Sequence, residues 1–198
     1  MKEIVKLILR TVYSYFYNGF AIFRMKHYGH GIFIGRGLEV EYPRGISIAD
    51  RTRLGRNCRL ACYPDENGVY GRIVIQPCWL GNNISILSSN EVLIKSGALL
   101  ASNISMVSYN HGMNPEAGCP YGGQPLEGSP IIIGKKTWIG EGCIISSGVE
   151  IGDWSIVGAG SVVTKSIPPY SIAVGNPAKV IKKYSFEKHK WVNSLNNE

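Results

Sequence analysis

The sequence predicts an all-β fold built from stacked three-sided coils, because two features repeat with a period of six residues. Aliphatic residues stand at six consecutive steps in the C-terminal half, at Ile133, Ile139, Ile145, Ile151, Val157 and Val163. Glycine follows four of the six, and a small or β-branched residue stands four places after each of the first five. This period fits neither a helix nor a two-sided strand. Three short sides per coil, each pointing one aliphatic residue inward, satisfy it.

The same period is present, more faintly, in the N-terminal half. It is carried by Ile48, Leu54 and Leu60, by Leu80 and Ile86, and by Ile94, Leu100 and Met106. We interpret the intervening segments "YPDENGVYGR" and "SSNEVL" as insertions at corners. An ordinary β-sandwich with coincidental spacing is the alternative, and six uninterrupted matches argue against it.

A chain of 198 residues is long enough for one domain with short additions. We expect an apolar helical segment over residues 1–30, the β-helix over 31–167 with an insertion loop at 107–130, and a C-terminal extension over 168–198. Pro168 and Pro169 are expected to end the strand pattern, because neither can donate to a β-ladder.

The charge indicates which class of partner the protein binds, and the cysteine content indicates the redox compartment. The net charge of +7 comes from dispersed basic residues without interleaved aromatic residues, which favours a phosphorylated small molecule or a membrane surface over nucleic acid. Five cysteines without paired CxxC units indicate neither a disulfide framework nor a zinc knuckle. We expect a reducing cytoplasm.

The N-terminal segment is apolar but fits neither a signal peptide nor a membrane span. It lacks a small-residue cleavage site, and its longest uncharged run, residues 11–23, is too short to cross a bilayer. As a helix it would carry a narrow polar stripe of Glu3, Lys6, Arg10, Ser14 and Asn18. The rest is a wide apolar face of Ile4, Val5, Ile8, Val12, Tyr13, Phe16 and Phe20.

We expect that apolar face to be covered, and two interpretations remain open. The helix either caps the open first coil and protects its strand edges, or docks on a membrane interface. Basic residues would help the second, and they are Lys2, Lys6, Arg10, Arg24 and Lys26.

The segment that begins "IIIGKKTWIGEGCIISSGVEIGDWSIVGAG" and continues through "SVVTKSIPPYSIAVGNPAKVIKKY" resembles the hexapeptide-repeat acyltransferases, which include galactoside, maltose and O-antigen O-acetyltransferases. The resemblance is most specific over residues 131–183, good over 46–111 and absent over the first thirty. It implies a left-handed parallel β-helix, a homotrimer with active sites between subunits, acetyl-CoA as cosubstrate and no required metal.

The insertion loop opens with Asn110 and His111, at the root of a long break in the repeat. An imidazole can accept a proton from an acceptor hydroxyl, although a surface histidine without a role is the alternative. The resemblance implies that His111 is the catalytic base of a direct transfer. Asn110, Glu116 and Glu127 are all candidates to orient its ring, and Cys119 is a poor nucleophile because no base stands near it in the sequence.

The resemblance also implies the positions that hold acetyl-CoA. Trp138 would flank the pantetheine arm, and the backbone N–H of Glu141 would face the thioester carbonyl. Backbone contacts would come from Ala159 and Gly160, and the phosphate-bearing end would be approached by Thr164, Lys165, Lys179 and Lys182. A solvated basic face is the alternative for the lysines.

The acceptor is less constrained. Asn82 and Asn83 match acceptor-contacting positions, but the family's acidic residue in the next coil is replaced here by Ser89 and Asn90. We therefore favour O-acetylation of a bacterial surface polysaccharide over a galactoside or maltose acceptor. A nucleotide-amino-sugar N-acetyltransferase and a non-catalytic scaffold stay open. A zinc-dependent γ-type carbonic anhydrase is excluded, because only His111 lies in the repeat region.

Overall fold

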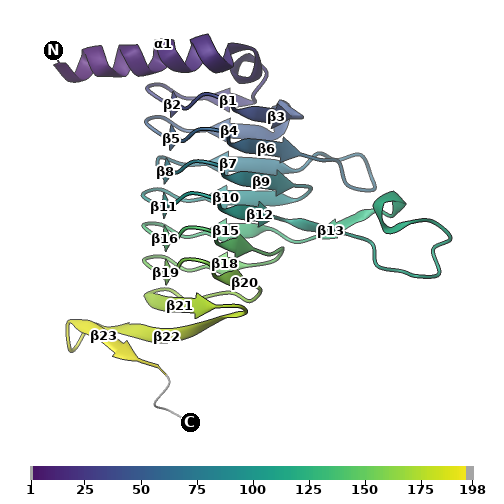
Figure 1. Ribbon diagram of the computed structural model, residues 1–198, viewed down its shortest axis with the longest axis vertical. Helices are drawn as coiled ribbons and strands as arrows, with labels where there is room; N and C mark the ends of the chain where they lie inside the picture. The colour runs from purple at the N-terminus through teal and green to yellow at the C-terminus, as the bar shows by residue number, and fades with distance from the viewer. Residues whose placement is uncertain (1, 195–198) are drawn as a thin grey trace.

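The computed structural model describes residues 2–194, with the side chains of the N-terminal helix described at only some positions. One helix, α1 (Lys2–Phe23), lies across the end of a tall three-sided β-helix, and an antiparallel pair of strands closes the other end (Figure 1). The predicted left-handed parallel β-helix is confirmed.

Three parallel sheets form the sides of the prism. Sheet A contains β1 (His27–Tyr28), β4 (Ile46–Ile48), β7 (Arg72–Ile75), β10 (Glu91–Ile94), β15 (Ile131–Ile133) and β18 (Glu150–Ile151). Sheet B contains β2 (Phe33–Ile34), β5 (Arg53–Leu54), β8 (Trp79–Leu80), β11 (Leu99–Leu100), β16 (Trp138–Ile139), β19 (Ile156–Val157), β21 (Ser171–Gly175), β22 (Ala178–Ser185) and β23 (Lys190–Asn193). Sheet C contains β3 (Glu39–Glu41), β6 (Arg59–Cys62), β9 (Ser85–Ser88), β12 (Ser105–Val107), β17 (Ile144–Ile145) and β20 (Val162–Val163).

The residues of the six-residue period form the core, as the sequence predicts. All six aliphatic residues from Ile133 to Val163 are buried, and so are Ile48, Leu54, Leu60, Leu80, Ile86, Ile94, Leu100 and Met106. Adjacent coils stack these positions directly, since Met106 pairs with Ile145 and Ile145 with Val163. The interior is therefore a continuous column of apolar side chains.

Small residues at the corners satisfy backbone carbonyls that the turns would otherwise leave buried and unpaired. The Thr137 hydroxyl donates to the Gly134 carbonyl at 2.8 Å, and the Ser161 hydroxyl donates to Gly158 at 2.7 Å. Gly134 itself permits close stacking, because a Cβ there would lie 2.6 Å from the backbone nitrogen of Asp153. The corner composition is thus a packing requirement of the coil.

One of the two expected corner insertions is confirmed and the other is wrong in extent. Residues 63–71 do leave the prism between β6 and β7, closed by a bridge between Pro64 and Tyr70, and Arg72 already begins β7. In the segment "SSNEVL", however, most residues belong to β9 and β10, so that only Ser89 and Asn90 form the corner. Val92 of β10 is fully buried, as is Ile94, so this strand points two side chains into the core.

Helix α1 caps the first coil, but with the side opposite to the one expected. Ser14 and Asn18 are buried against β2 and its flanks: the Ser14 hydroxyl accepts from the Ile34 N–H at 2.9 Å, and the Asn18 amide donates to the Gly35 carbonyl at 3.3 Å. The polar residues face inward because the open edge of the first coil presents backbone groups that require hydrogen-bond partners.

The apolar side of α1 faces outward, so it is not the side that packs on the first coil. The exposed fractions are 50% for Val5, 56% for Ile8, 59% for Val12 and 81% for Phe16. Tyr13 is the exception, since its ring stacks on Phe33 with centroids 5.6 Å apart. The side chains of Lys2, Glu3, Ile4, Lys6, Arg10 and Phe20 lie outside the described residues.

At the other end, parallel stacking continues past the two prolines. Ile167 still bridges to Ile151, and β21 pairs with β19 in parallel before β22 returns antiparallel to it. Pro168 and Pro169 therefore form a corner of the last coil, and sheet B extends beyond them.

Candidate active site

Each edge of the prism is the line along which two sheets meet. The chain runs from sheet A to B to C within each coil, so two edges border sheet C: the B/C edge, where the chain enters it, and the C/A edge, where it leaves. The insertion loop leaves at the C/A edge, between β12 of sheet C and β15 of sheet A (Figure 1). Sheet C and its two edges carry most of the predicted site.

His111 lies on a short hairpin at the root of the loop. It ends β13 (Tyr109–His111), which pairs antiparallel with β14 (Leu126–Gly128). Between these strands the loop forms one turn of 3-10 helix, η2 (Tyr121–Gly123). The imidazole is exposed and meets the Tyr109 ring edge to face, with centroids 6.4 Å apart. A reactant at this edge could therefore reach the imidazole.

The hairpin register separates His111 from two of its expected partners. Asn110 stands opposite Glu127, and His111 stands opposite Leu126. Because successive side chains of a strand point to opposite faces, the Asn110 and Glu127 side chains lie across the hairpin from the imidazole. The catalytic role of Asn110 stays a prediction. Glu116 lies farther out in the loop, where its backbone N–H donates to the Asn114 side chain at 2.9 Å.

The positions expected to hold acetyl-CoA flank the lower half of sheet C. Glu141 lies at the B/C edge before β17, and Ala159 and Gly160 lie at the same edge before β20. Thr164 and Lys165 follow β20 at the C/A edge, the edge from which His111 projects. All five are exposed, and β17 and β20 stack directly beneath β12. These positions therefore border one surface.

The backbone at Glu141 is arranged as the oxyanion prediction requires. The neighbouring Gly140 and Gly142 N–H groups donate to Val157 and Ser102 in adjacent coils. In the described part of the chain the Glu141 N–H makes no such bond, while its carboxylate accepts from the Asn103 amide at 2.8 Å. The N–H is thus available to a ligand oxygen, and its role stays a prediction.

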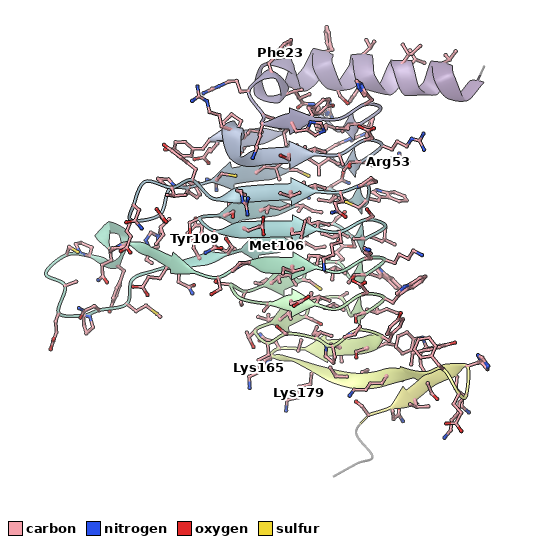
Figure 2. All side chains as sticks on the ribbon, turned by 180° about the vertical axis from the view of Figure 1, so that it is seen from behind. Phe23, Arg53, Met106, Tyr109, Lys165 and Lys179 are labelled. Carbon is pink, nitrogen blue, oxygen red and sulfur yellow. The ribbon has the colours of Figure 1, made fainter. Side chains whose placement is uncertain are left out.

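Trp138 and the last two lysines belong to sheet B. Trp138 lies on the outer face of β16 and is 51% exposed. Lys179 and Lys182 lie on β22, paired with Val174 and Ile172 of β21. Figure 2 shows Lys165 and Lys179 both projecting from the C-terminal end of the prism.

Asn82 and Asn83 are committed to the scaffold of the B/C edge. The side-chain Oδ1 of Asn82 accepts from the Arg56 backbone N–H at 2.8 Å. Asn83 belongs to a ladder of side-chain hydrogen bonds that links successive coils, from Asn57 through Asn83 and Asn103 to Glu141. Within a single chain, Asn82 and Asn83 lie at the B/C edge, whereas His111 lies at the opposite edge of sheet C.

The structure adds a polar and aromatic cluster beside His111 that the sequence did not indicate. Arg59 donates to the Glu41 carboxylate at 2.6 Å and to the Tyr63 hydroxyl at 2.9 Å. The Tyr63 ring meets that of Tyr109 edge to face at 5.8 Å, and Tyr109 in turn meets His111. These residues come from three separate coils and share no motif, so only the stacking register reveals them.

Environment shifts the ionisation of this cluster. The hydrogen bond from Arg59 holds the pKa of Glu41 below its usual value. Burial raises the pKa of Tyr63 and of Tyr109. Glu41 is therefore a carboxylate and both phenols are neutral near pH 7, so the cluster offers hydroxyl donors and acceptors to a neutral polar ligand.

The second insertion closes over the same region. Residues 64–66 and 122–126 together line a cavity of about 350 Å³, so the 63–71 insertion and the 107–130 insertion loop lie close together. Figure 1 shows both projecting from the same side of the prism. Sheet C thus carries an exposed imidazole, a free backbone donor and cationic side chains, which are the elements of acyl transfer from a phosphate-bearing donor.

Comparison with known proteins identifies the class. The model for the bacterial transferase hexapeptide, six repeats, matches residues 130–165. The putative lipopolysaccharide biosynthesis O-acetyl transferase WbbJ of Escherichia coli K12 is 32% identical over 165 residues, which cover 69% of this chain and 84% of that protein. Galactoside O-acetyltransferase of the same organism is 37% identical over 169 residues, covering 82% and 72%.

Solved structures agree. A galactoside acetyltransferase in complex with coenzyme A superimposes with a TM-score of 0.57 and 28% identity, covering 82% of this chain and 68% of that one. AntD, an N-acyltransferase from Bacillus cereus, superimposes with a TM-score of 0.70 over 86% and 91%, and at 21% identity it shows the shared fold.

The chain belongs to the hexapeptide-repeat acyltransferases. It is an acetyltransferase whose cosubstrate is acetyl-CoA, so the predicted class of enzyme and its cosubstrate are confirmed.

Proposed function

We propose that this enzyme transfers an acetyl group from acetyl-CoA to a sugar hydroxyl during the synthesis of a bacterial surface polysaccharide, with His111 as general base. The observation that carries the proposal is the position of His111. It projects from the C/A edge at β12, between the donor-type positions below and the tyrosine and arginine cluster above. The family relative named for lipopolysaccharide synthesis supports the choice of acceptor.

The imidazole takes the proton of the acceptor hydroxyl, and the oxygen attacks the thioester carbonyl. The Glu141 N–H stabilises the negative charge that develops on the carbonyl oxygen. The carbon–sulfur bond then breaks, and the imidazolium returns its proton to the CoA thiolate. These reaction steps need no covalent enzyme intermediate, so Cys119 has no part in the mechanism.

His111→Ala should lower acetyl transfer by roughly 100-fold or more, the effect expected when a general base is lost. Thiol release from acetyl-CoA is measured with a panel of sugar acceptors and with their amino-sugar counterparts. His30→Ala is the matched control, because His30 is an equally exposed histidine in the first coil. Wild-type turnover by the His111→Ala variant would refute the assignment of His111 as general base. Release with amines alone would identify an N-acetyltransferase, and none with any sugar would contradict the proposed acceptor class.

We propose that the enzyme is a homotrimer with its active sites between subunits. Sheet B supports this, because Trp79, Leu99 and Trp138 form one column on its outer face, in register across β8, β11 and β16. Each is at least 40% exposed. Such a column on a flat sheet is suited to packing against a second copy. It also puts Trp138 where a neighbouring subunit can complete the donor groove.

We propose a cytoplasmic location, at the inner face of a membrane. Within the part of the chain that the structure describes, no helix has both the length and the apolar character needed to cross a bilayer. The support for surface contact is the outward face of α1, where Val5, Ile8, Leu9, Val12 and Phe16 are exposed. Arg24 and Lys26 follow its C-terminal end and complement anionic lipid headgroups.

Vesicle flotation tests the membrane contact. The wild-type protein should float with phosphatidylglycerol vesicles and much less with phosphatidylcholine vesicles. Val12→Glu should abolish flotation, whereas Val69→Glu should not, because Val69 is a similarly exposed valine on the 63–71 insertion. Equal flotation of wild type and Val12→Glu would refute the contact. A change in oligomer size for Val12→Glu would instead assign the face to another copy of the chain.

A further inference from the structure

A basic cavity lies at the N-terminal end of the C/A edge, outside the site described above. Its volume is about 440 Å³, and its lining includes Arg24, Lys26, Arg44 and Arg72 together with the rings of Tyr42 and Tyr70. Arg24 and Lys26 come from the segment after α1. Tyr42 and Arg44 come from the corner between β3 and β4, which includes the one-turn 3-10 helix η1 (Pro43–Gly45). Tyr70 lies at the end of the 63–71 insertion, and Arg72 begins β7. Four cationic side chains thus converge on one cavity.

The positive charge of this cavity is only partly neutralised. Arg72 pairs with Glu91, with 2.9 Å between Nη2 and Oε1. Glu41, the nearest acidic residue along the chain to Tyr42, is occupied by Arg59. No acidic side chain in the described residues forms an ion pair with Lys26 or Arg44. A cavity of this composition is suited to a phosphate or diphosphate group.

A row of aromatic rings connects the cavity with His111. Ring centroids are 5.0 Å apart for Tyr70 and Tyr42, 6.0 Å for Tyr42 and Tyr63, and 5.8 Å for Tyr63 and Tyr109. The last step, from Tyr109 to His111, is 6.4 Å. Each step is comparable with the length of one sugar unit in an extended glycan. Tyrosine rings offer an apolar face to sugar C–H groups and a hydroxyl for hydrogen bonding.

The row runs away from the acetyl-CoA positions. Tyr42 and Tyr63 follow β3 and β6, above β12, whereas Thr164 and Lys165 follow β20, below it. In Figure 2, Tyr109 and Lys165 project on the same side of the prism, with Lys165 nearer the C-terminal end. The donor and the aromatic row can therefore be occupied together, with His111 between them.

We propose that the acceptor is an oligosaccharide with a phosphate or diphosphate group at one end. The anionic end lies in the basic cavity, the sugar units lie along Tyr42, Tyr63 and Tyr109, and the hydroxyl to be acetylated reaches His111. This assignment rests on the proposed function and specifies its acceptor. The diphosphate can be esterified to a nucleoside or to a lipid alcohol, and the cavity recognises what the two share.

Binding of inorganic pyrophosphate tests the cavity without requiring catalysis. Calorimetry is performed with saturating CoA, so that the phosphate positions of the donor are already filled. The wild-type protein should bind pyrophosphate, and Arg44→Ala and Lys26→Ala should each weaken binding about tenfold, as expected for a lost charge-assisted hydrogen bond. Arg36→Ala is the control, because Arg36 is an exposed arginine at the B/C edge. Undetectable binding, or equal binding by all variants, would overturn the proposal.

Acceptor kinetics test the sugar track. One oligosaccharide is supplied in three forms: neutral, linked to a nucleoside diphosphate, and linked to a short polyprenyl diphosphate. The proposal requires a higher kcat/KM for at least one diphosphate form, and Arg44→Ala should reduce that preference about tenfold. The preferred form identifies the source of the diphosphate. Equal or better use of the neutral form would refute the inference while leaving acetyl transfer established, and no transfer to any form would instead contradict the proposed function.

Discussion

The orientation of α1 gives the most direct test of the structure, through the variant Ser14→Ala. The Ser14 hydroxyl accepts from the Ile34 N–H at 2.9 Å and donates to the Ile32 carbonyl at 3.3 Å, and the side chain is fully buried. Alanine leaves both backbone groups without this partner at a site closed to water. We expect a loss of about 1–3 kcal/mol in the free energy of unfolding.

For a protein of this size, 1 kcal/mol corresponds to a shift in Tm of roughly 2–4 °C, so the Ser14→Ala variant should melt several degrees lower. Thermal unfolding measures this, and amide hydrogen exchange at Ile34 should accelerate. Val12→Ala is the matched control, because Val12 lies on the outward side and is 59% exposed. If Val12→Ala cost as much as Ser14→Ala, the apolar side would be the packed one and our account of the cap would be refuted.

Three further outcomes are expected. Lys165→Ala should raise the KM for acetyl-CoA about tenfold through loss of a phosphate contact, with kcat retained, and an unchanged KM would mean that the phosphates lie elsewhere. Ellman's reagent near pH 7 should react rapidly with one of the five cysteines, Cys119, because it is exposed. Burial raises the pKa of Cys62 and Cys78 to about 12, and it also raises the pKa of Cys58 and Cys143. Fast reaction of a second thiol in the folded protein would contradict this expectation. The folded-state pKa of Glu41 is lowered, so its contribution to stability is present above the unfolded pKa and is lost as pH falls through the folded pKa; Glu41→Gln should reduce the acid-side loss of Tm, and an unaltered pH profile would contradict the assignment.

The periodic part of the fold could be predicted from the sequence because each inward position is a local choice. Ile139 and Ile145 are inward whatever lies elsewhere in the chain, since the six-residue period alone determines which side they face. The long loop and His111 could be located for the same reason, as a departure from that period. The inward face of α1 could not, because amphipathicity favours burial of Ile8 and Val12, whereas the open first coil demands hydrogen bonds from Ser14 and Asn18.

The row of aromatic rings also could not be predicted from the sequence. Tyr42, Tyr63 and Tyr109 stand about 20 and 46 residues apart along the chain, and only the lengths of the intervening coils and insertions align them. Asn82 and Asn83 show a related case. Their side chains hydrogen-bond between successive coils, which only the structure shows, and the acceptor contact that the family resemblance implies for them stays a prediction.

The number of stacked coils sets the distance between α1 and the hairpin that carries His111. This hairpin leaves after β12, with three complete coils between it and α1 along the C/A edge. Every coil gained or lost on that side would change the distance from the helix to the imidazole by one strand spacing, about 4.8 Å, and leave the coils below β12 unchanged. If the acceptor lies along this edge as proposed, chains of this architecture can evolve toward longer or shorter acceptors by duplicating or deleting single coils.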